Sequence, residues 1–448
     1  MAFNKQELVS EICEQYLEED GGRPWIVAFS GGKDSTTLLM LVWEALKRLT
    51  PIERKKRPVY VICNNTLVEN PSVLKFVNKQ LSAITEKAVE QELPIYVHHT
   101  VPRLDDSFWV NLIGRGYPAP NNMFRWCTER LKISPTTQYI KEKIADHGEV
   151  IILIGTRSDE SSSRAASIKR HEVKGERLRN HPLPNAKAYA PIKDMTTSEV
   201  WTYLEMNKNP WTSDRNHELR TLYLNGSGGD CPIVMDTQTP SCGNSRFGCW
   251  VCTVVKRDRS MEALIDNGQD WMIPLMQVRD FLYETIDRQN EEYSPEKYRM
   301  PIRRNKSDGI GPYWPKYRYQ ILKMVLEAQK VASRESSDNQ LITLQELSAI
   351  QILWNRDYIY EYSVSDAYQE VFGESFDFGH MALDIDNEKE LLKQVCAANP
   401  DDVKLISRLL DAQKNKGLLL KKIGLQNDLE SILQEHVRPT FTSFDNYQ

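Results

Sequence analysis

Residues 25–49 read WIVAFSGGKDSTTLLMLVWEALKRL and decide the fold of the first part of the chain. The short apolar run at residues 25–29 predicts a buried strand, and residues 36–49 are apolar around most of a helical circumference. A helix of that kind is buried against a sheet. Three further strand patterns alternate with helical ones, at residues 59–63, 95–98 and 150–154. This alternation predicts an α/β fold, a parallel sheet with helices on both faces.

The overall composition is that of a globular chain. Its 448 residues carry a net charge of −5, and 40% of them are hydrophobic, which excludes a wholly disordered protein. The apolar runs are too short to cross a bilayer, and the N-terminus has no signal-peptide pattern. We therefore expect a cytoplasmic protein without membrane contact. Contact with nucleic acid requires a local basic patch such as residues 164–179, which hold six Lys or Arg against two Glu; a solvated surface loop explains them equally.

Composition along the chain predicts three parts. Residues 1–215 carry the alternating pattern, which a strand-like cue at residues 190–192 closes. Residues 216–330 are rich in glycine, proline, cysteine and tryptophan, whereas residues 331–448 are helical in pattern. A capping box at Thr343 and Glu346 supports a helix there.

The loop between the first strand and the first long helix is a candidate phosphate site. Its glycines allow backbone amides to close around an anion, and the helix dipole favours negative charge at that point. Lys33 would neutralise phosphate charge; Asp34 either positions Mg²⁺ or caps the helix. An ordinary glycine turn is the alternative. The candidate phosphate-binding residues here are Ser30, Gly31, Gly32, Lys33, Asp34, Ser35 and Thr36.

Two other predicted strands end in residues suited to a nucleotide, at the edge where open α/β sheets bind ligands. After the second strand, Asn65 and Thr66 are candidates for adenosine, although any strand-to-helix turn uses such residues. After the fourth, Gly155 permits close backbone approach and Arg157 is suited to a phosphate oxygen.

Cys127 is a candidate nucleophile or sulfur carrier. It lies among Arg125, Arg130 and Lys132, cations that favour a thiolate. A buried cysteine that only packs, beside Trp126, is the alternative.

A cluster of four cysteines predicts a metal centre. Cys231, Cys242, Cys249 and Cys252 lie within twenty-two residues, a density that in a reducing compartment indicates metal ligation. Zinc and an iron-sulfur cluster suit this spacing equally.

The motif SGGKDS resembles the pyrophosphate loop of the PP-loop ATP pyrophosphatases. Together with FRWCTERLKISP, GTRSDESSSRA and CPIVMDTQTPSCGNSRFGCWVC, it resembles the DndC family of DNA phosphorothioation proteins, which is related to the phosphoadenylylsulfate reductases. The resemblance covers residues 22–259. It implies an adenine nucleotide alpha-hydrolase-like fold that uses ATP with Mg²⁺, and it favours a 4Fe-4S cluster over zinc. It also implies DNA, a cysteine desulfurase and other Dnd proteins as partners.

The resemblance implies an ATP pyrophosphatase and sulfurtransferase that adenylates a DNA backbone phosphate and replaces an oxygen by sulfur. Lys33, Asp34 and Cys127 are the expected catalytic residues. A sulfonucleotide reductase needs a mobile cysteine, and the last one here, Cys396, lies on a helical pattern. A tRNA thiolase and a nucleotide-bound scaffold that recruits partners through its helical tail remain alternatives.

Overall fold

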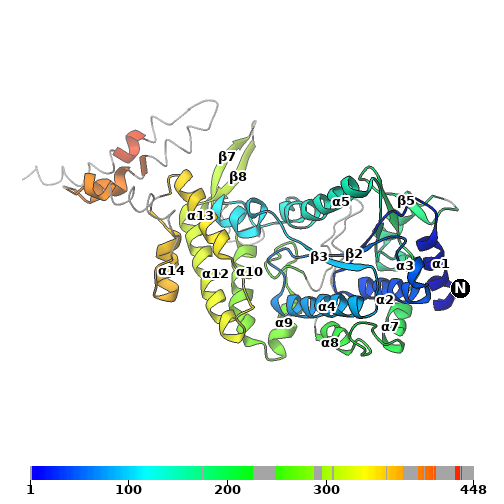
Figure 1. Cartoon of the computed structure of the whole chain (residues 1–448). Helices are drawn as coiled ribbons and strands as arrows, with labels where there is room; N and C mark the ends of the chain where they lie inside the picture. Colours follow the sequence, from blue (N-terminus) through cyan, green and yellow to red (C-terminus); the bar gives the residue numbers. More distant parts are fainter. Residues whose placement is uncertain are drawn as a thin grey trace, which may run out of the picture. The chain divides into compact units, whose positions relative to one another are not determined.

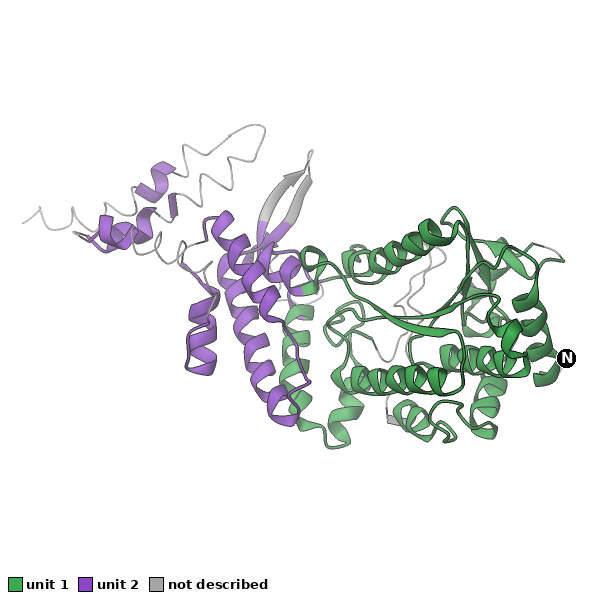
Figure 2. Ribbon diagram, viewed as in Figure 1, with its two compact units in different colours: residues 1–108, 120–283 green, residues 109–119, 284–448 purple. Residues whose placement is uncertain are grey.

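The computed structural model groups the chain into two compact units (Figure 2). Unit 1 comprises residues 1–108 and 120–283, and unit 2 comprises residues 109–119 and 284–448. The structure describes residues 3–173, 175–225, 248–286, 295–304, 307–359, 361–376, 392–397, 399–406, 408–409, 429–433 and 435. The boundaries predicted from composition at residues 215 and 330 stay a prediction.

A six-stranded sheet forms the centre of unit 1, and it confirms the predicted α/β class. The strand order is β3-β2-β1-β4-β6-β5, with every pair parallel except β6 and β5. The strands are β1 (Trp25–Ala28), β2 (Val59–Asn64), β3 (Ile95–Thr100), β4 (Val150–Leu153), β5 (Leu178–Asn180) and β6 (Ala186–Tyr189). The first four lie where the sequence places them. The ends of β1, β2 and β4 that carry the candidate residues lie on one edge.

Helices cover both faces of this sheet (Figure 1). Buried residues of α1, α2, α4, α7 and α8 pack on one face, and those of α5 pack on the other. The helices of unit 1 are α1 (Lys5–Leu17), α2 (Lys33–Arg48), α3 (Pro51–Arg54), α4 (Pro71–Glu90), α5 (Ser134–His147), α6 (Ser162–His171), α7 (Thr197–Met206), α8 (His217–Asn225), α9 (Arg259–Asp266) and α10 (Ile273–Glu284). Short 3₁₀ or π turns are η1 (Leu104–Asp106), η3 (Thr128–Ile133), η4 (Ser158–Glu160) and η5 (Asp270–Met272).

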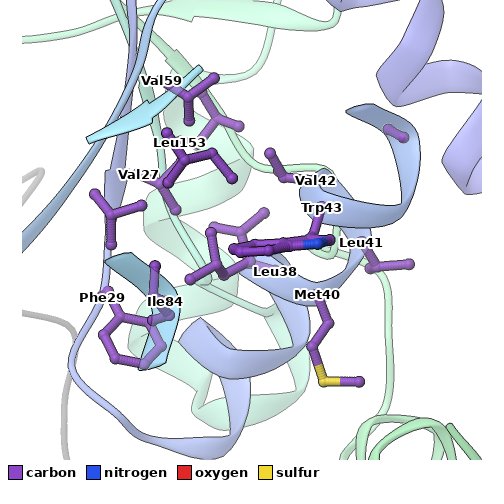
Figure 3. Close-up of a cluster of buried hydrophobic side chains, with 14 of the residues drawn as sticks. Val27, Phe29, Leu38, Met40, Leu41, Val42, Trp43, Val59, Ile84 and Leu153 are labelled. Carbon is purple, nitrogen blue, oxygen red and sulfur yellow. The ribbon is translucent and has the colours of Figure 1, made fainter. Parts of the chain in front are cut away.

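Helix α2 is buried from Ser35 to Leu46 except at Glu44, as its sequence predicts. Leu38, Leu41 and Val42 have no exposed surface, and Trp43 is equally enclosed (Figure 3). They pack with β-strand residues such as Val27 in one continuous core. Because α2 begins directly after the candidate phosphate loop, this core fixes the position of the loop.

The strand expected at residues 190–192 is wrong in position. The strand is β6, which ends at Tyr189, and the chain turns immediately afterwards. Pro191 has no backbone N–H to donate to a ladder, so the strand does not continue through it.

Unit 2 is mainly helical in its described residues. Its elements are η2 (Val110–Gly114), α11 (Pro295–Tyr298), β7 (Arg299–Arg304), β8 (Ser307–Tyr313), α12 (Pro315–Glu335), α13 (Leu344–Arg356) and α14 (Val364–Phe372). The predicted Thr343 capping box begins α13. Trp109 donates to the Leu341 carbonyl at 2.8 Å, and Trp354 to the Ile113 carbonyl at 3.0 Å. These buried bonds hold the inserted segment 109–119 to the C-terminal helices. Among the described residues, no helix combines the length and apolarity that a membrane span needs.

Candidate active site

The loop between β1 and α2 requires glycine at its tightest point. Gly31 has φ of +72°, a left-handed conformation that other residues adopt only with strain. A Cβ on Gly31 would lie 2.7 Å from Val77 Cγ2 of α4. Both the backbone angle and the contact with α4 therefore exclude a side chain.

Hydroxyl oxygens accept the N–H groups of this loop. The Ser30 amide donates to Ser35 Oγ at 3.2 Å, and the Gly32 amide donates to Ser30 Oγ at 3.4 Å. The Lys33 amide, the first of α2, donates to the phenol of Tyr223 at 3.0 Å. Loop amides at a helix N-terminus are the arrangement that binds phosphate, and a charged oxygen is a stronger acceptor than a hydroxyl.

Two ion pairs that share Asp34 lie next to the loop. The Arg157 side chain is 1% exposed, and its Nε lies 2.6 Å from Asp34 Oδ1. Asp34 Oδ2 lies 2.6 Å from Lys33 Nζ. Arg157 also donates to the Met195 carbonyl at 3.0 Å. Both Asp34 oxygens thus face cations, and Arg157 positions Asp34. The predicted Mg²⁺ role of Asp34 and the phosphate role of Arg157 stay predictions.

Gly155 makes its close approach to α2. A Cβ there would lie 3.1 Å from the backbone carbon and oxygen of Asp34, a tight contact. The predicted approach of Gly155 to a nucleotide stays a prediction. Nearby, burial raises the pKa of the Glu160 carboxyl, and Arg164 at 3.2 Å opposes that rise. The edge of the sheet at β4 is therefore tightly packed against the start of α2.

The loop opens into a pocket of about 760 Å³, counting its solvent-open part. Of the predicted residues, Ser30, Gly31, Gly32 and Asn65 line it. Ser35 is not one of the pocket-lining residues that the structure describes, but its hydroxyl accepts the Ser30 amide proton. Thr36 and Thr66 are buried and are not among the described residues that line this pocket.

The pocket also contains residues that sequence reasoning missed as ligand contacts. These are Cys63, Glu69, His99, Lys132, Leu222 and Tyr223, together with one face of α4. Burial raises the pKa of the Cys63 thiol to about 12, and Glu69 adds to the rise, so the thiol stays neutral. The sequence indicates Lys132 only as a cation near Cys127. Tyr223 gives no local signal, because it is far from the loop in sequence.

Cys127 is the first residue of the segment 127–132, in which Lys132 lines the pocket. It is the N-cap of η3 and is half-buried, and it is not one of the described residues that line the pocket. Asn64 at the end of β2 donates to the Leu131 carbonyl at 3.0 Å, which places the next residue, Lys132, in the pocket wall. Arg130 pairs with Asp106. The reactive role of Cys127 stays a prediction.

The cysteine segment packs beside the pocket of the glycine loop. Thr66 has no exposed surface, and its Oγ1 donates to Glu69 Oε1 at 2.8 Å. The same hydroxyl oxygen lies 3.4 Å from Cys249 Sγ. The Trp250 amide donates to the Val68 carbonyl at 3.0 Å. Thr66 is therefore placed to contact Cys249, and Asn65 and Glu69 on either side of it line the pocket.

A buried arginine holds the turn that carries Cys252. The Cys252 amide donates to the Cys249 carbonyl at 3.0 Å, so both cysteines share one turn. Arg279, 2% exposed, donates to the carbonyls of Cys252 at 3.1 Å and Lys256 at 2.9 Å, and also to that of Val255. The turn therefore has a fixed backbone.

The structure describes only two of the four cysteines of the predicted metal centre. Cys231 and Cys242 lie outside the described residues. Within the described ranges, no three His, Cys, Asp or Glu side chains lie close enough to hold a metal ion. Cys249 and Cys252, two half-buried thiols on one turn, fit one half of a thiolate-bound centre. The four-cysteine centre stays a prediction.

Three comparisons relate the chain to known proteins. It is 29% identical over 189 residues to the uncharacterized protein MJ0066 of Methanocaldococcus jannaschii, a match that covers 42% of this chain. The chain spans about a third of the length of that relative, 33%. A crystal structure of phosphoadenylyl-sulfate reductase from Candida auris, a phosphate complex, is similar over 51% of this chain and 87% of its own, at 13% identity. Its TM-score of 0.30 is too low to support an inference.

The family comparison covers the sheet, the loop and the turn that carries Cys249 and Cys252. The model of the phosphoadenosine phosphosulfate reductase domain matches residues 24–255, more than half of the chain. Members of this family are nucleotide-using enzymes of the PP-loop type that act in sulfur metabolism. This chain belongs to the phosphoadenosine phosphosulfate reductase domain family.

Proposed function

We propose that this protein is the ATP-dependent sulfurtransferase component of DNA phosphorothioate modification, as the resemblance to the DndC family implies. One observation carries the proposal. Cys249 Sγ lies 3.4 Å from Thr66 Oγ1, on the segment whose Asn65 and Glu69 line the pocket of the glycine loop. A thiol-bearing segment therefore adjoins the nucleotide pocket, which is the juxtaposition that ATP-driven sulfur chemistry needs.

The proposed reaction has two displacements at phosphorus. ATP enters as its Mg²⁺ complex with the β- and γ-phosphates in the loop. A non-bridging oxygen of a DNA phosphodiester attacks the α-phosphorus, the bond to the bridging oxygen breaks, and pyrophosphate leaves. A sulfur nucleophile then attacks the DNA phosphorus. The bond between that phosphorus and the transferred oxygen breaks, so AMP leaves with an oxygen from the DNA backbone.

The chain supplies charge and orientation for these steps. The loop amides and Lys33 stabilise the departing pyrophosphate, and Asp34, fixed by Arg157, keeps Lys33 in place. Lys132 in the pocket wall offsets the charge of two phosphates brought together. Cys127 is the proposed sulfur carrier. Delivery from a persulfide on it also requires a thiol, whose electron pair cleaves the S–S bond.

The cysteine segment is proposed to hold the cofactor. Cys231, Cys242, Cys249 and Cys252 would bind a 4Fe-4S cluster, which supplies electrons or an iron-bound sulfur beside the pocket. DNA, a cysteine desulfurase and the other Dnd proteins are the proposed partners.

An oxygen-isotope experiment tests this function. The anaerobically reconstituted protein, the desulfurase and the other Dnd proteins are incubated with ATP and duplex DNA whose non-bridging backbone oxygens carry ¹⁸O. We expect AMP to gain one ¹⁸O, and pyrophosphate and phosphorothioate linkages to appear in equal amounts. Mass spectrometry of AMP and of nuclease-digested DNA measures both products.

Two variants and two substrates make the result specific. Lys33→Ala is expected to abolish both products, whereas Lys79→Ala, at an exposed ion pair with Glu218, is expected to retain them. Isotope transfer from labelled tRNA instead of DNA would establish a tRNA thiolase. Sulfite release from a sulfonucleotide, without ATP consumption, would establish a reductase. AMP that carries no ¹⁸O from either labelled nucleic acid would contradict adenylation of both acceptors.

A further inference from the structure

A tyrosine from a distant part of unit 1 reaches the glycine loop. Tyr223 of α8 lies 190 residues after Lys33, and its phenol oxygen accepts the Lys33 amide proton at 3.0 Å. Tyr223 lines the same pocket as Ser30, Gly31 and Gly32. No sequence motif marks this residue, and the reaction described above assigns it no role.

The bonded amide defines where the phenol lies. The Lys33 N–H is the first of α2, so it has no acceptor inside the helix and points out of the N-terminus. That is the direction from which a helix N-terminus binds an anion. A phosphate seated on Gly31 and Gly32 would therefore lie beside the oxygen of Tyr223.

The hydroxyl has the chemistry to bind such a phosphate. A phenol that accepts an N–H still has its own proton to donate. Accepting the amide proton polarises the O–H bond and makes it a better donor. A hydrogen bond from this hydroxyl to a charged phosphate oxygen would be of the strong, charge-assisted kind.

The ring of Tyr223 is held in place before any ligand arrives. It packs edge-on against Trp201 of α7, with ring centroids 4.9 Å apart and planes at 83°. Lys33 Nζ lies 5.9 Å from the centre of the same ring. Leu222, its neighbour, also packs against the core that contains α2. Because the side chain is already ordered, little conformational entropy is lost when it binds a ligand.

We propose that Tyr223 is a pyrophosphate-binding residue. It donates its O–H to a non-bridging oxygen of the diphosphate held by the loop, and its oxygen keeps the Lys33 amide bond. This inference rests on the proposed seating of ATP, with the β- and γ-phosphates in the loop. It assigns the end of α8 to recognition of the leaving group, so ligands that lack a diphosphate do not use Tyr223.

Calorimetric titration of the full chain tests the assignment, with inorganic pyrophosphate, ATP and AMP as separate ligands. Tyr223→Phe keeps the ring and its packing on Trp201 but removes the hydroxyl. Loss of one hydrogen bond to a charged group predicts pyrophosphate and ATP binding weaker by about 10- to 100-fold. AMP affinity is expected to change by less than about threefold. Tyr96→Phe, at an exposed tyrosine on β3, is the matched control.

The possible results distinguish failure of the Tyr223 assignment from failure of the proposed function. Unchanged or tighter pyrophosphate binding in Tyr223→Phe would overturn the assignment, because the phenol would then only fill an empty loop. An equal loss for AMP would also overturn it. If the wild type binds neither ATP nor pyrophosphate, the proposed function fails together with this inference, whereas wild-type binding that is insensitive to Tyr223→Phe contradicts this inference alone.

A second measurement covers the case in which the variant does not fold. 3-Fluorotyrosine at position 223 preserves the shape of the side chain and its hydroxyl. Its ¹⁹F resonance is expected to shift on addition of pyrophosphate and to stay in place with AMP. A resonance that ignores pyrophosphate at saturating concentration would overturn the assignment.

Discussion

Two segments of unit 1 contribute to the pocket of the glycine loop, and they are held in place in different ways. The loop after β1 is mainly local: the hydroxyls of Ser30 and Ser35 accept amide protons of the loop itself, and Tyr223 contributes one bond from a distant element. The segment after β2 is held by residues about 180 positions later, through Thr66 to Cys249 and Val68 to Trp250. A local motif is therefore visible in the sequence, whereas a junction made by tertiary contacts is not.

The largest expected effect is at the local loop. Gly31→Ala places a methyl group 2.7 Å from Val77 Cγ2 and strains a φ of +72°. Because the loop must shift, we expect ATP affinity to fall by about 100-fold or more. Equilibrium binding of ATP to the folded variant measures it.

Gly21→Ala is the matched control for this change. Gly21 has a φ of +81°, but a Cβ there meets nothing within 4 Å. It therefore carries only the backbone strain, about 1–2 kcal/mol of unfolding free energy. Equal losses of ATP affinity in the two variants would show that the Val77 contact does not shape the loop.

The charge pair behind the loop comes next. Arg157→Met leaves the carboxylate of Asp34, 13% exposed, without its buried partner. We expect the free energy of unfolding to fall by about 3 kcal/mol. The double variant with Asp34→Asn should lose less than the sum of the two single losses, because each single change already removes the ion pair between Arg157 and Asp34.

Urea unfolding measures this series, and Arg23→Met is its control. Arg23 pairs with Glu149 at 2.8 Å on the surface, so its loss should cost at most about 1 kcal/mol. If Arg157→Met behaves like Arg23→Met, or the double variant is strictly additive, Arg157 does not position Asp34.

In the second region, Arg279 is the residue to remove. Arg279→Met leaves the carbonyls of Cys252 and Lys256 without their buried donor. We expect a loss of about 2 kcal/mol in unfolding free energy, and less iron bound per chain after anaerobic reconstitution. Chemical unfolding and iron analysis measure the two effects. Arg257→Met, at an exposed pair with Glu262, should change neither. If Arg279→Met binds as much iron as the wild type, this arginine does not support the proposed metal centre.

The smallest effect is expected at Thr66. Thr66→Val keeps the shape but loses the bond to Glu69 and the contact with Cys249, at a cost of about 1 kcal/mol. Thr66→Ser should restore the lost stability. Thermal unfolding of the three proteins compares them. A Val variant as stable as the wild type, with Ser the weaker one, would mean that the methyl group and not the hydroxyl holds the junction.

Local patterns explain which elements the sequence predicts. The strands β1 to β4, the buried α2 and the Thr343 capping box depend on neighbouring residues, and all are confirmed. The role of Gly155 is different, because its close neighbour is Asp34, on another element. Lys132 and Tyr223 enter the pocket only through tertiary packing. The same holds for Trp109, whose segment joins unit 2 through Leu341, more than 200 residues away. Hydrophobic periodicity along the sequence does not reveal such long-range contacts.

The seating of the diphosphate in the β1–α2 loop is the claim on which the account depends. A crystal structure with α,β-methylene ATP and Mg²⁺ tests it most directly. The account predicts the β- and γ-phosphates against the amides of Gly31 and Gly32, with the phenol of Tyr223 bonded both to the Lys33 amide and to a phosphate oxygen. A triphosphate bound elsewhere in unit 1, with the Gly32 amide still bonded to the Ser30 hydroxyl, would contradict it.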